Sequence, residues 1–548
     1  MTAVADAVAS ALGQHGARHV FGLMGDDTAV LTSAVRSAGI SYHDARHENT
    51  AVAMAAGYSR TGGGLGVCIL SRGPGLTNAI TAAVNAQRGP GHVLVVIGDG
   101  PTRPPARVLG PDYKALDIVS LAAALDLPLI RPASSATVLP GVAEAVELTR
   151  RHGLALLALP GDLAEVAGPG EPTADPGEPA VGTGIAEPGP PRAAALTAAA
   201  TVLAGAERPL IVAGRGAWAA GARDAIVDLA ERTGAVVSCT LGAKDMFAGY
   251  AFDAGLIGSF SHVSGRRAMA QADVVLAFGA GLNKFSTVRG TALPDVPLIH
   301  VDTAGEHIGR YHPADVAVVG DARTVARDLL TAIDAGAFAK PLHSAATRAA
   351  LADRTEPYED VSNSRTVDPR ALLERLDRVL PRQRAVVSDA GNFFGFVPSR
   401  ISVPDPDHFM LSSDFSAIGL GLGHALGAAF ARPATTTVLF VGDGGLLMSL
   451  GDLETLARSG LPVIVVVMND GGYGAERHFL ESRGVSGSIA AFPSTEFADL
   501  AGSWGIEAHT VCSSADLDAL GDTLDGRQDP LLLDCRVSPA VVAPFLNS

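Results

Sequence analysis

The chain lacks several features that mark whole classes of protein. Basic residues are few relative to acidic ones: the chain has 41 Lys and Arg but 57 Asp and Glu, which gives a net charge of −16. Such a charge argues against a nucleic-acid partner, although it leaves room for a local basic pocket that binds an anionic substrate. No apolar run is long enough to cross a bilayer, and no secretory signal pattern is present. We therefore expect a cytoplasmic protein without a membrane partner.

Cysteine is also rare. The four cysteines, Cys68, Cys239, Cys512 and Cys535, are scattered without metal-binding or redox spacing. They are typical of small buried apolar residues in a reducing compartment. What the chain does have is length and apolar content: it has 548 residues, of which 47% are hydrophobic. That is enough for about three globular domains.

Alternating patterns of helix and strand predict three α/β domains, each with a doubly wound parallel sheet. The first spans residues 1–165, with a helix at Val4–Leu12 and strands at 19–23, 65–70, 93–97 and 154–159. The second spans 193–335, with strands at 210–213, 235–239, 274–278 and 298–301. The third spans 367–548 and begins with a strand at 385–388. Segments 166–192, rich in Pro, Gly and Glu, and 336–366 are predicted linkers.

The densest functional signal lies between Val438 and Gly474. Two apolar runs, 438–441 and 461–468, suit strands of a parallel sheet buried on both faces. Leucines between them recur at helical spacing and predict one helix: Leu446, Leu447, Leu450, Leu453 and Leu456. The two strand ends should lie at the sheet edge where open α/β sheets bind ligands.

The residues at those two strand ends suit a phosphate and a metal ion. The turn Gly442-Asp443-Gly444-Gly445 lets backbone N–H groups at a helix N-terminus approach a phosphate. Asp443 and the pair Asn469-Asp470 offer oxygen ligands, which suit Mg²⁺ or Ca²⁺. The alternative is an ordinary β-α-β unit with a polar turn.

Together with Arg46-His47-Glu48 in the first domain, this motif resembles that of thiamine-diphosphate-dependent enzymes of the acetolactate synthase and 2-oxo acid decarboxylase superfamily. The resemblance covers essentially the whole chain. It implies a pyrimidine-binding first domain, a central domain and a diphosphate-binding third domain, with thiamine diphosphate and Mg²⁺ as cofactors. It further implies that Asp443, Asp470 and the backbone carbonyl of Gly472 bind the metal.

The same resemblance assigns roles to residues in the first domain. Glu48 is the catalytic residue that hydrogen-bonds the pyrimidine N1′, although a lone Glu at a helix start is usually only a surface residue. His47 either faces the substrate or is packed against the protein. Pro74 and Asn78 belong to the segment Ser71–Asn78, which is similar to the family's turn beside the pyrimidine.

In the third domain the resemblance adds further cofactor-binding residues. Ile418 matches the apolar wedge that holds the cofactor bent, and the backbone of Ser416 meets its 4′ amino group. The full set of cofactor-binding candidates there is Gly391, Asn392, Ser416, Ile418, Gly442, Asp443, Gly444, Gly445, Asp470, Gly472, Tyr473 and Gly474.

Several positions depart from the family pattern or stay open. Lys114 stands where the family has a Gln near the reacting centre, and Arg72 where it has a small residue. Lys114 is either a catalytic or anion-binding residue or a solvated lysine on a loop. Glu476 and His478 are either acid–base groups or exposed helix charges. A second GDG, Gly98–Gly100, reads as a structural turn because prolines follow it.

The resemblance implies decarboxylation of a pyruvate-like 2-oxo acid, followed by carboligation of the remaining fragment to an acceptor. The alternatives are a specialised lyase or transferase acting on a sulfo-, phospho- or acyl-CoA donor, and a non-catalytic cofactor-binding subunit. Asn283 stands where FAD-binding members typically carry Arg, so we expect no FAD. A homodimer or homotetramer with active sites between subunits is implied.

Overall fold

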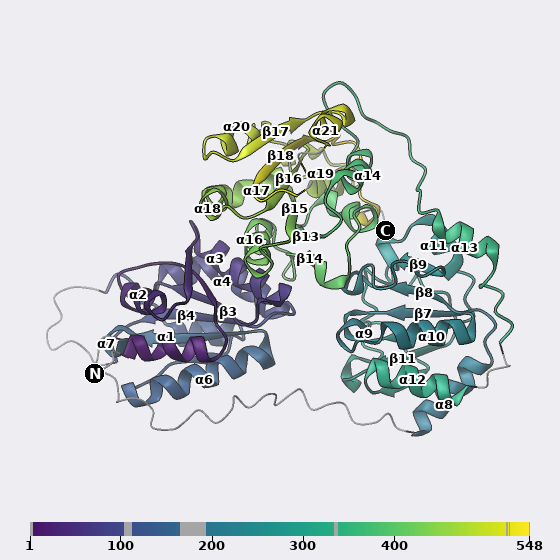
Figure 1. Ribbon diagram of the computed structural model, residues 1–548, viewed down its shortest axis with the longest axis horizontal. Helices are drawn as coiled ribbons and strands as arrows, with labels where there is room; N and C mark the ends of the chain where they lie inside the picture. Colours follow the sequence, from purple (N-terminus) through teal and green to yellow (C-terminus); the bar gives the residue numbers. More distant parts are fainter. Residues whose placement is uncertain are drawn as a thin grey trace.

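The computed structural model describes residues 4–102, 112–164, 193–333, 338–521, 524 and 526–546. They form three domains, each built on a six-stranded sheet whose named strands all pair in parallel. The third domain lies between the other two in the view of Figure 1. The predicted α/β class with three parallel sheets is therefore confirmed. The predicted linker 166–192 lies outside the described residues.

In the first domain the strands lie in the order β2-β1-β3-β4-β6-β5. Their bounds are β1 His19–Leu23, β2 Ser41–Asp44, β3 Gly66–Leu70, β4 Val93–Asp99, β5 Leu129–Ile130 and β6 Leu154–Pro160. The main helices are α1 Val4–Gln14, α2 Ala29–Ser37, α3 Glu48–Tyr58, α4 Pro74–Arg88, α5 Ile118–Ala124 and α6 Ser135–His152. The central strands β3 and β6 are buried at every residue, as apolar runs between two helical layers must be.

The central domain has the strand order β12-β11-β10-β7-β8-β9. Its strands are β7 Pro209–Ala213, β8 Val236–Cys239, β9 Asp253–Leu256, β10 Val274–Phe278, β11 Leu298–Asp302 and β12 Val316–Val319. Its longer helices are α8 Ala193–Ala204, α10 Arg223–Thr233, α11 Val263–Met269 and α12 Ala322–Ala332. The segment 336–366 contains helix α13, Ala345–Ala352.

The third domain has the strand order β14-β13-β15-β16-β18-β17. Its strands are β13 Arg384–Ser388, β14 Phe409–Leu411, β15 Thr436–Gly442, β16 Val463–Asn469, β17 Glu507–Val511 and β18 Leu531–Arg536. Its helices include α14 Pro369–Val379, α16 Gly421–Ala431, α17 Asp443–Met448, α18 Leu453–Ser459, α19 Gly474–Glu481, α20 Phe497–Gly502 and α21 Ser514–Leu520. The strands β15 and β16 are neighbours, as the apolar runs predict.

The single helix predicted from the leucine spacing is wrong. Helix α17 ends at Met448, a short 3-10 turn covers Leu450–Asp452, and α18 follows. Asp452 ends the turn at this break, and its buried carboxylate accepts hydrogen bonds from the Thr455 hydroxyl at 2.9 Å and from the Arg46 backbone N–H at 2.7 Å. The break thus joins this segment to the first domain.

The first and third domains share one hydrophobic core, in which α3 crosses α16. The helices approach closely because glycines stand at the crossing. A Cβ atom on Gly427 would lie 2.0 Å from the Met54 carbonyl oxygen, and one on Gly57 would lie 2.2 Å from the His424 carbonyl oxygen. Only a residue without a side chain fits at either point.

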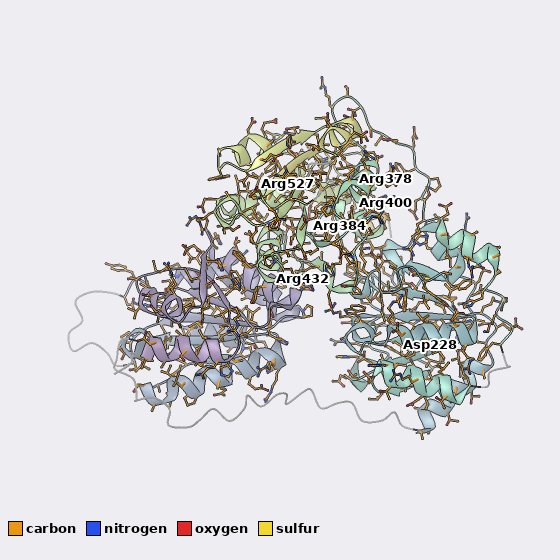
Figure 2. The ribbon with its side chains drawn as sticks, in the orientation of Figure 1. Asp228, Arg378, Arg384, Arg400, Arg432 and Arg527 are labelled. Carbon is orange, nitrogen blue, oxygen red and sulfur yellow. The ribbon has the colours of Figure 1, made fainter. Side chains whose placement is uncertain are left out.

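Polar contacts reinforce this junction. Arg60 pairs with Asp414 at 2.5 Å, and Asn85 donates to the Ser412 carbonyl at 3.0 Å. Arg432, which Figure 2 labels where the two domains meet, donates from Nε to the carbonyl oxygen of Thr61 at 3.0 Å. In the part of the chain that the structure describes, no helix is both long and apolar enough to span a membrane.

Candidate active site

The adjacent ends of β15 and β16 form the centre of the site. Gly442 pairs with Met468 in the parallel register, so the turns that follow the two strands leave the sheet at the same edge. Asp443 begins α17 after the first strand, and Asp470 follows the second. The edge therefore brings together the two carboxylates that the sequence predicts there.

Asp443 is almost fully buried, with 2% of its surface exposed. Its Oδ1 accepts the backbone N–H of Gly444 at 2.9 Å, and its Oδ2 accepts that of Gly472 at 3.0 Å. The side chain thereby fixes the turn after β15 to the turn after β16. Burial raises the pKa of Asp443 to about 6, although these backbone hydrogen bonds oppose the rise.

Asp470 lies close enough to Asp443 for the two charges to interact. Burial, and after it the negative charge of Asp443, raise the pKa of Asp470 to about 7. Among the described residues, Arg477 supplies an opposing charge near it and also donates to the Asp470 and Gly471 carbonyl oxygens at 3.4 and 3.3 Å. Two like-charged carboxylates, one buried and one half-buried, are a favourable place for a divalent cation.

The glycines around this pair pack against neighbouring side chains and leave no room for a Cβ. A Cβ on Gly444 would lie 2.4 Å from the Tyr473 ring, and one on Gly474 would lie 2.2 Å from the Asp470 carboxylate. Backbone atoms can therefore face a ligand directly here. Together with the start of α17 and the carboxylate oxygens, this cradle fits a diphosphate held through a divalent cation.

Asn469, the neighbour of Asp470, forms hydrogen bonds within the third domain. It is buried, and its Nδ2 donates to Asp534 Oδ1 at 2.8 Å and to the Thr495 carbonyl at 3.2 Å. It therefore connects β16 to β18 and to the loop before α20. Of the pair Asn469-Asp470, only Asp470 lines the cavity described next.

A cavity of about 490 Å³ opens at this edge, between the third and central domains. Twelve predicted cofactor-binding residues of the third domain line it: Gly391, Asn392, Ser416, Ile418, Gly442, Asp443, Gly444, Gly445, Asp470, Gly472, Tyr473 and Gly474. Glu476 lines it as well, so this open position does face the site. His478 does not; it is buried, its pKa is lowered by burial, and its Nδ1 lies 3.6 Å from Glu481.

The side chain of Asn392 makes two hydrogen bonds within the protein. Its Nδ2 donates to the Val541 carbonyl at 2.7 Å, and its Oδ1 accepts the Ala543 backbone N–H at 2.8 Å. These bonds hold the C-terminal segment against the site. One N–H of this amide stays available to a ligand. Ser416, with a positive φ of 58°, shapes another turn that lines the cavity.

Asp389 is a site residue that the sequence motifs do not single out. It is completely buried, and it accepts hydrogen bonds from the Gly419 N–H at 2.8 Å, the Ala390 N–H at 2.9 Å and the Ser412 hydroxyl at 3.0 Å. Burial raises its pKa. It connects the turn after β13 with the turn before α16, so it positions both walls of the cradle. In the sequence, the signal for Asp389 is its place directly after a predicted strand.

The candidates from the first domain lie together, but outside the cavity. Glu48 Oε2 accepts the Asn78 Nδ2 at 3.1 Å, at the start of α4 where Pro74 is the first residue. His47 caps α3, because its Nδ1 accepts the Asn49 backbone N–H at 3.1 Å. Among the described residues, none of the first domain lines the cavity.

Lys114 and Arg72 line a separate pocket of about 170 Å³ in the first domain. Both cations already have partners. Lys114 pairs with Asp26 and lies 3.5 Å from Asp27, and Arg72 pairs with Asp112 at 2.5 Å. The second GDG lies in the same pocket, where the Asp99 carboxylate pairs with Arg131.

No cluster of three or more His, Cys, Asp or Glu side chains with metal-binding geometry occurs in the described ranges. A cation at Asp443 and Asp470 would therefore complete its shell with backbone carbonyls such as that of Gly472 and with oxygens of a bound ligand. The arrangement can thus hold a metal and an anionic ligand together more readily than a metal alone.

Comparisons with known proteins agree with this geometry. Residues 2–108 match the N-terminal TPP binding domain of thiamine pyrophosphate enzymes, 196–329 match their central domain, and 389–535 their C-terminal TPP binding domain. The chain is 27% identical to acetolactate synthase isozyme 2 large subunit of Escherichia coli, over 97% of this chain and 94% of the relative. It is 29% identical to sulfoacetaldehyde acetyltransferase of Roseovarius nubinhibens, over 86% and 81%. It is also 29% identical to acetolactate synthase large subunit of Parasynechococcus marenigrum, over 92% and 82%.

Proposed function

The chain belongs to the thiamine-diphosphate-dependent enzymes of the acetolactate synthase superfamily, and on that premise we propose its reaction. It decarboxylates a 2-oxo acid and joins the remaining fragment to an acceptor. The observation that carries the proposal is the cradle at the ends of β15 and β16, where buried carboxylates and side-chain-free backbone face one cavity.

The cofactor and the metal have defined places in this proposal. Asp443, Asp470 and the carbonyl of Gly472 would hold Mg²⁺, and the start of α17 would face the diphosphate. When bound, thiamine diphosphate would supply a nucleophilic carbon and an acceptor for the electron pair that decarboxylation releases. Ile418, which lines the cavity, would pack against the cofactor, and Asp389 keeps the surrounding turns in place.

Glu48 holds and moves a proton at the pyrimidine N1′. Asn78 orients its carboxylate by donating to Oε2. Because the lining of the cavity comes from the central and third domains, we propose that Glu48 reaches it from the first domain of a second copy. The active form is then a homodimer or a larger assembly.

The direct test is Glu48→Gln, with Glu144→Gln on the exposed face of α6 as the matched control. Glu48→Gln should lower kcat by at least about 100-fold, a typical contribution of a positioned acid–base group. This variant should still bind thiamine diphosphate with Mg²⁺, as measured by tryptophan fluorescence. Wild-type turnover in Glu48→Gln would refute the assignment.

A second candidate is a transferase that uses a sulfonated or otherwise anionic donor. The sulfoacetaldehyde acetyltransferase relative and the cations Arg72 and Lys114 favour it. Their ion pairs with Asp26 and Asp112 count against it, because a substrate anion would have to displace a carboxylate. A parallel assay of pyruvate and sulfoacetaldehyde separates the two candidates: the donor that is turned over identifies the reaction.

A further inference from the structure

The segment that leads into Glu48 is held by the third domain of the same chain. It follows β2, which ends at Asp44, and it runs through Arg46 to the start of α3. The Arg46 backbone N–H donates to Asp452 Oδ1 at 2.7 Å, and the Asp44 carbonyl oxygen accepts from Arg458 Nη2 at 2.8 Å. Two main-chain groups just before Glu48 are therefore bonded to the two ends of one third-domain helix, α18.

The bond to Asp452 is the most sheltered of these contacts. Asp452 is 1% exposed, and the oxygen that accepts the Arg46 N–H also accepts the hydroxyl of Thr455, a residue that is itself buried. Arg46 pairs with Glu454 at 2.6 Å as well, but these two side chains are 43% and 29% exposed, so their ion pair contributes little. A hydrogen bond to a carboxylate shielded from water is stronger. Asp452 is therefore the contact that matters most for this segment.

This contact lies close to Glu48 along the chain. Only His47, whose side chain caps α3, stands between Arg46 and Glu48. A shift of the Arg46 main chain therefore moves the first turn of α3, and Glu48 with it. Asn78 restrains only the far end of Glu48, by donating to Oε2 at 3.1 Å. The main-chain position of Glu48 thus depends on Asp452, and the orientation of its carboxylate depends on Asn78.

We propose that Asp452 is a positioning residue for Glu48. The inference rests on the proposed function, in which Glu48 holds and moves a proton and so must lie within about 3 Å of its partner atom. Asp452 does not line the cavity, so it acts through the main chain of Arg46. A displacement of about 1 Å at a reacting group can lower turnover about 100-fold. Loss of the Asp452 carboxylate should therefore appear in kcat and leave binding of the cofactor unchanged.

The experiment compares Asp452→Ala with Asp452→Asn in the holoenzyme, with the donor that the assay of pyruvate and sulfoacetaldehyde identifies. Asp452→Ala should lower kcat about 10- to 100-fold, and its affinity for thiamine diphosphate with Mg²⁺ should stay that of the wild type. Asn keeps an oxygen that can accept both the Arg46 N–H and the Thr455 hydroxyl. Asp452→Asn should therefore restore kcat to within about threefold of the wild type.

Asp321 provides a matched control in the central domain. Its Oδ1 likewise accepts a backbone N–H and a threonine hydroxyl, both from Thr324, at 2.9 and 3.0 Å. Asp321→Ala removes the same kind of hydrogen bonds at the start of α12, away from Glu48 and outside the cavity. It should lower Tm and leave kcat unchanged, which separates loss of stability from displacement of Glu48.

A second measurement needs no turnover. Hydrogen–deuterium exchange of the cofactor-free protein reports on the Arg46 amide and on the first turn of α3. Exchange in peptides that cover residues 45–50 should be faster in Asp452→Ala than in the wild type, and it should be unchanged in Asp452→Asn and Asp321→Ala. Unchanged exchange in Asp452→Ala would show that the carboxylate does not hold this segment, and would refute the proposal.

The last measurement asks whether Asp452 acts through Glu48. If it does, Asp452→Ala should lower the residual kcat of Glu48→Gln by no more than about twofold. A general structural defect would instead lower kcat by the same factor in both backgrounds. If Asp452→Ala does not fold, Asp452→Ser replaces it with the same expectations, because its side chain is too short to reach the Arg46 N–H.

The outcomes separate this inference from the proposed function. Wild-type kcat in Asp452→Ala, or an equal loss in the Glu48→Gln background, would refute the positioning role while the proposed reaction stands. Wild-type turnover in Glu48→Gln would overturn the assignment of Glu48, and the inference would fall with it. Faster exchange together with a loss of kcat that disappears in the Glu48→Gln background supports both.

Discussion

The replacement Asp470→Asn should change how the stability of the metal-free protein depends on pH. Burial and the charge of Asp443 raise the pKa of Asp470 from 3.8 to about 7 in the folded state. The folded protein therefore holds a proton that the unfolded chain releases. Its contribution to stability is fully present below about pH 4 and is lost as the pH rises through about 7.

The magnitude follows from the same values. A pKa raised from 3.8 to about 7 corresponds to about 4 kcal/mol, and roughly 2 kcal/mol of it falls between pH 5.5 and 8.5. For a unit made of the first and third domains, which share one core, that is about 3 °C in Tm. Asp470→Asn removes this titration, and it also removes the like charge beside Asp443, so its Tm should fall much less over the same range.

The assay is thermal unfolding of the apo protein in EDTA across pH 5.5 to 8.5, repeated with excess Mg²⁺ and thiamine diphosphate. The ligands should abolish most of the pH dependence in the wild type, because a cation stabilises the ionised pair. Asp499→Asn, on the exposed side of α20, serves as the control and should behave as the wild type. Identical pH profiles for wild type and Asp470→Asn would show that the two carboxylates do not interact as described.

Two further predictions concern glycines. Gly444→Ala places a Cβ 2.4 Å from the Tyr473 ring and should weaken binding of thiamine diphosphate at least tenfold in a fluorescence titration. Gly502→Ala is the control, because a Cβ there meets nothing within 4 Å. It should leave binding unchanged and raise the free energy of unfolding by about 0.5 kcal/mol. Wild-type affinity in Gly444→Ala would contradict the proposal that this glycine backbone binds the cofactor. Gly427→Val forces side-chain atoms onto the Met54 carbonyl and should cost about 3 kcal/mol or more, read as a lower Tm by calorimetry. An unchanged Tm would mean that the helices can separate at little cost.

The sheet interiors could be predicted from the sequence, and the sheet edges could not. The predicted strands form the middle of all three sheets, because an uninterrupted apolar run is what burial on both faces requires. The strands left unpredicted at the six edges, such as Ser41–Asp44 and Glu507–Val511, carry polar or half-exposed residues. Only β18, an apolar strand between β16 and β17, was missed inside a sheet.

The same division applies to the site. The turns after β15 and β16 could be predicted, because glycine and carboxylate at a strand end are local signals. The role of Asp389 could not, since its three hydrogen bonds reach residues from 390 to 419 that come together only in the fold. The aromatic side of the cavity also escaped prediction, because Phe260, Phe285 and Phe545, which line it, come from three distant segments.

The close crossing of α3 and α16 has a consequence for how the molecule comes apart. Its core includes residues of both the first and the third domain, whereas the central domain has core clusters of its own. Cooperative melting follows shared packing rather than chain order. The sequence-distant first and third domains should thus form one thermodynamic unit, and the central domain, although it lies between them in the chain, should form another.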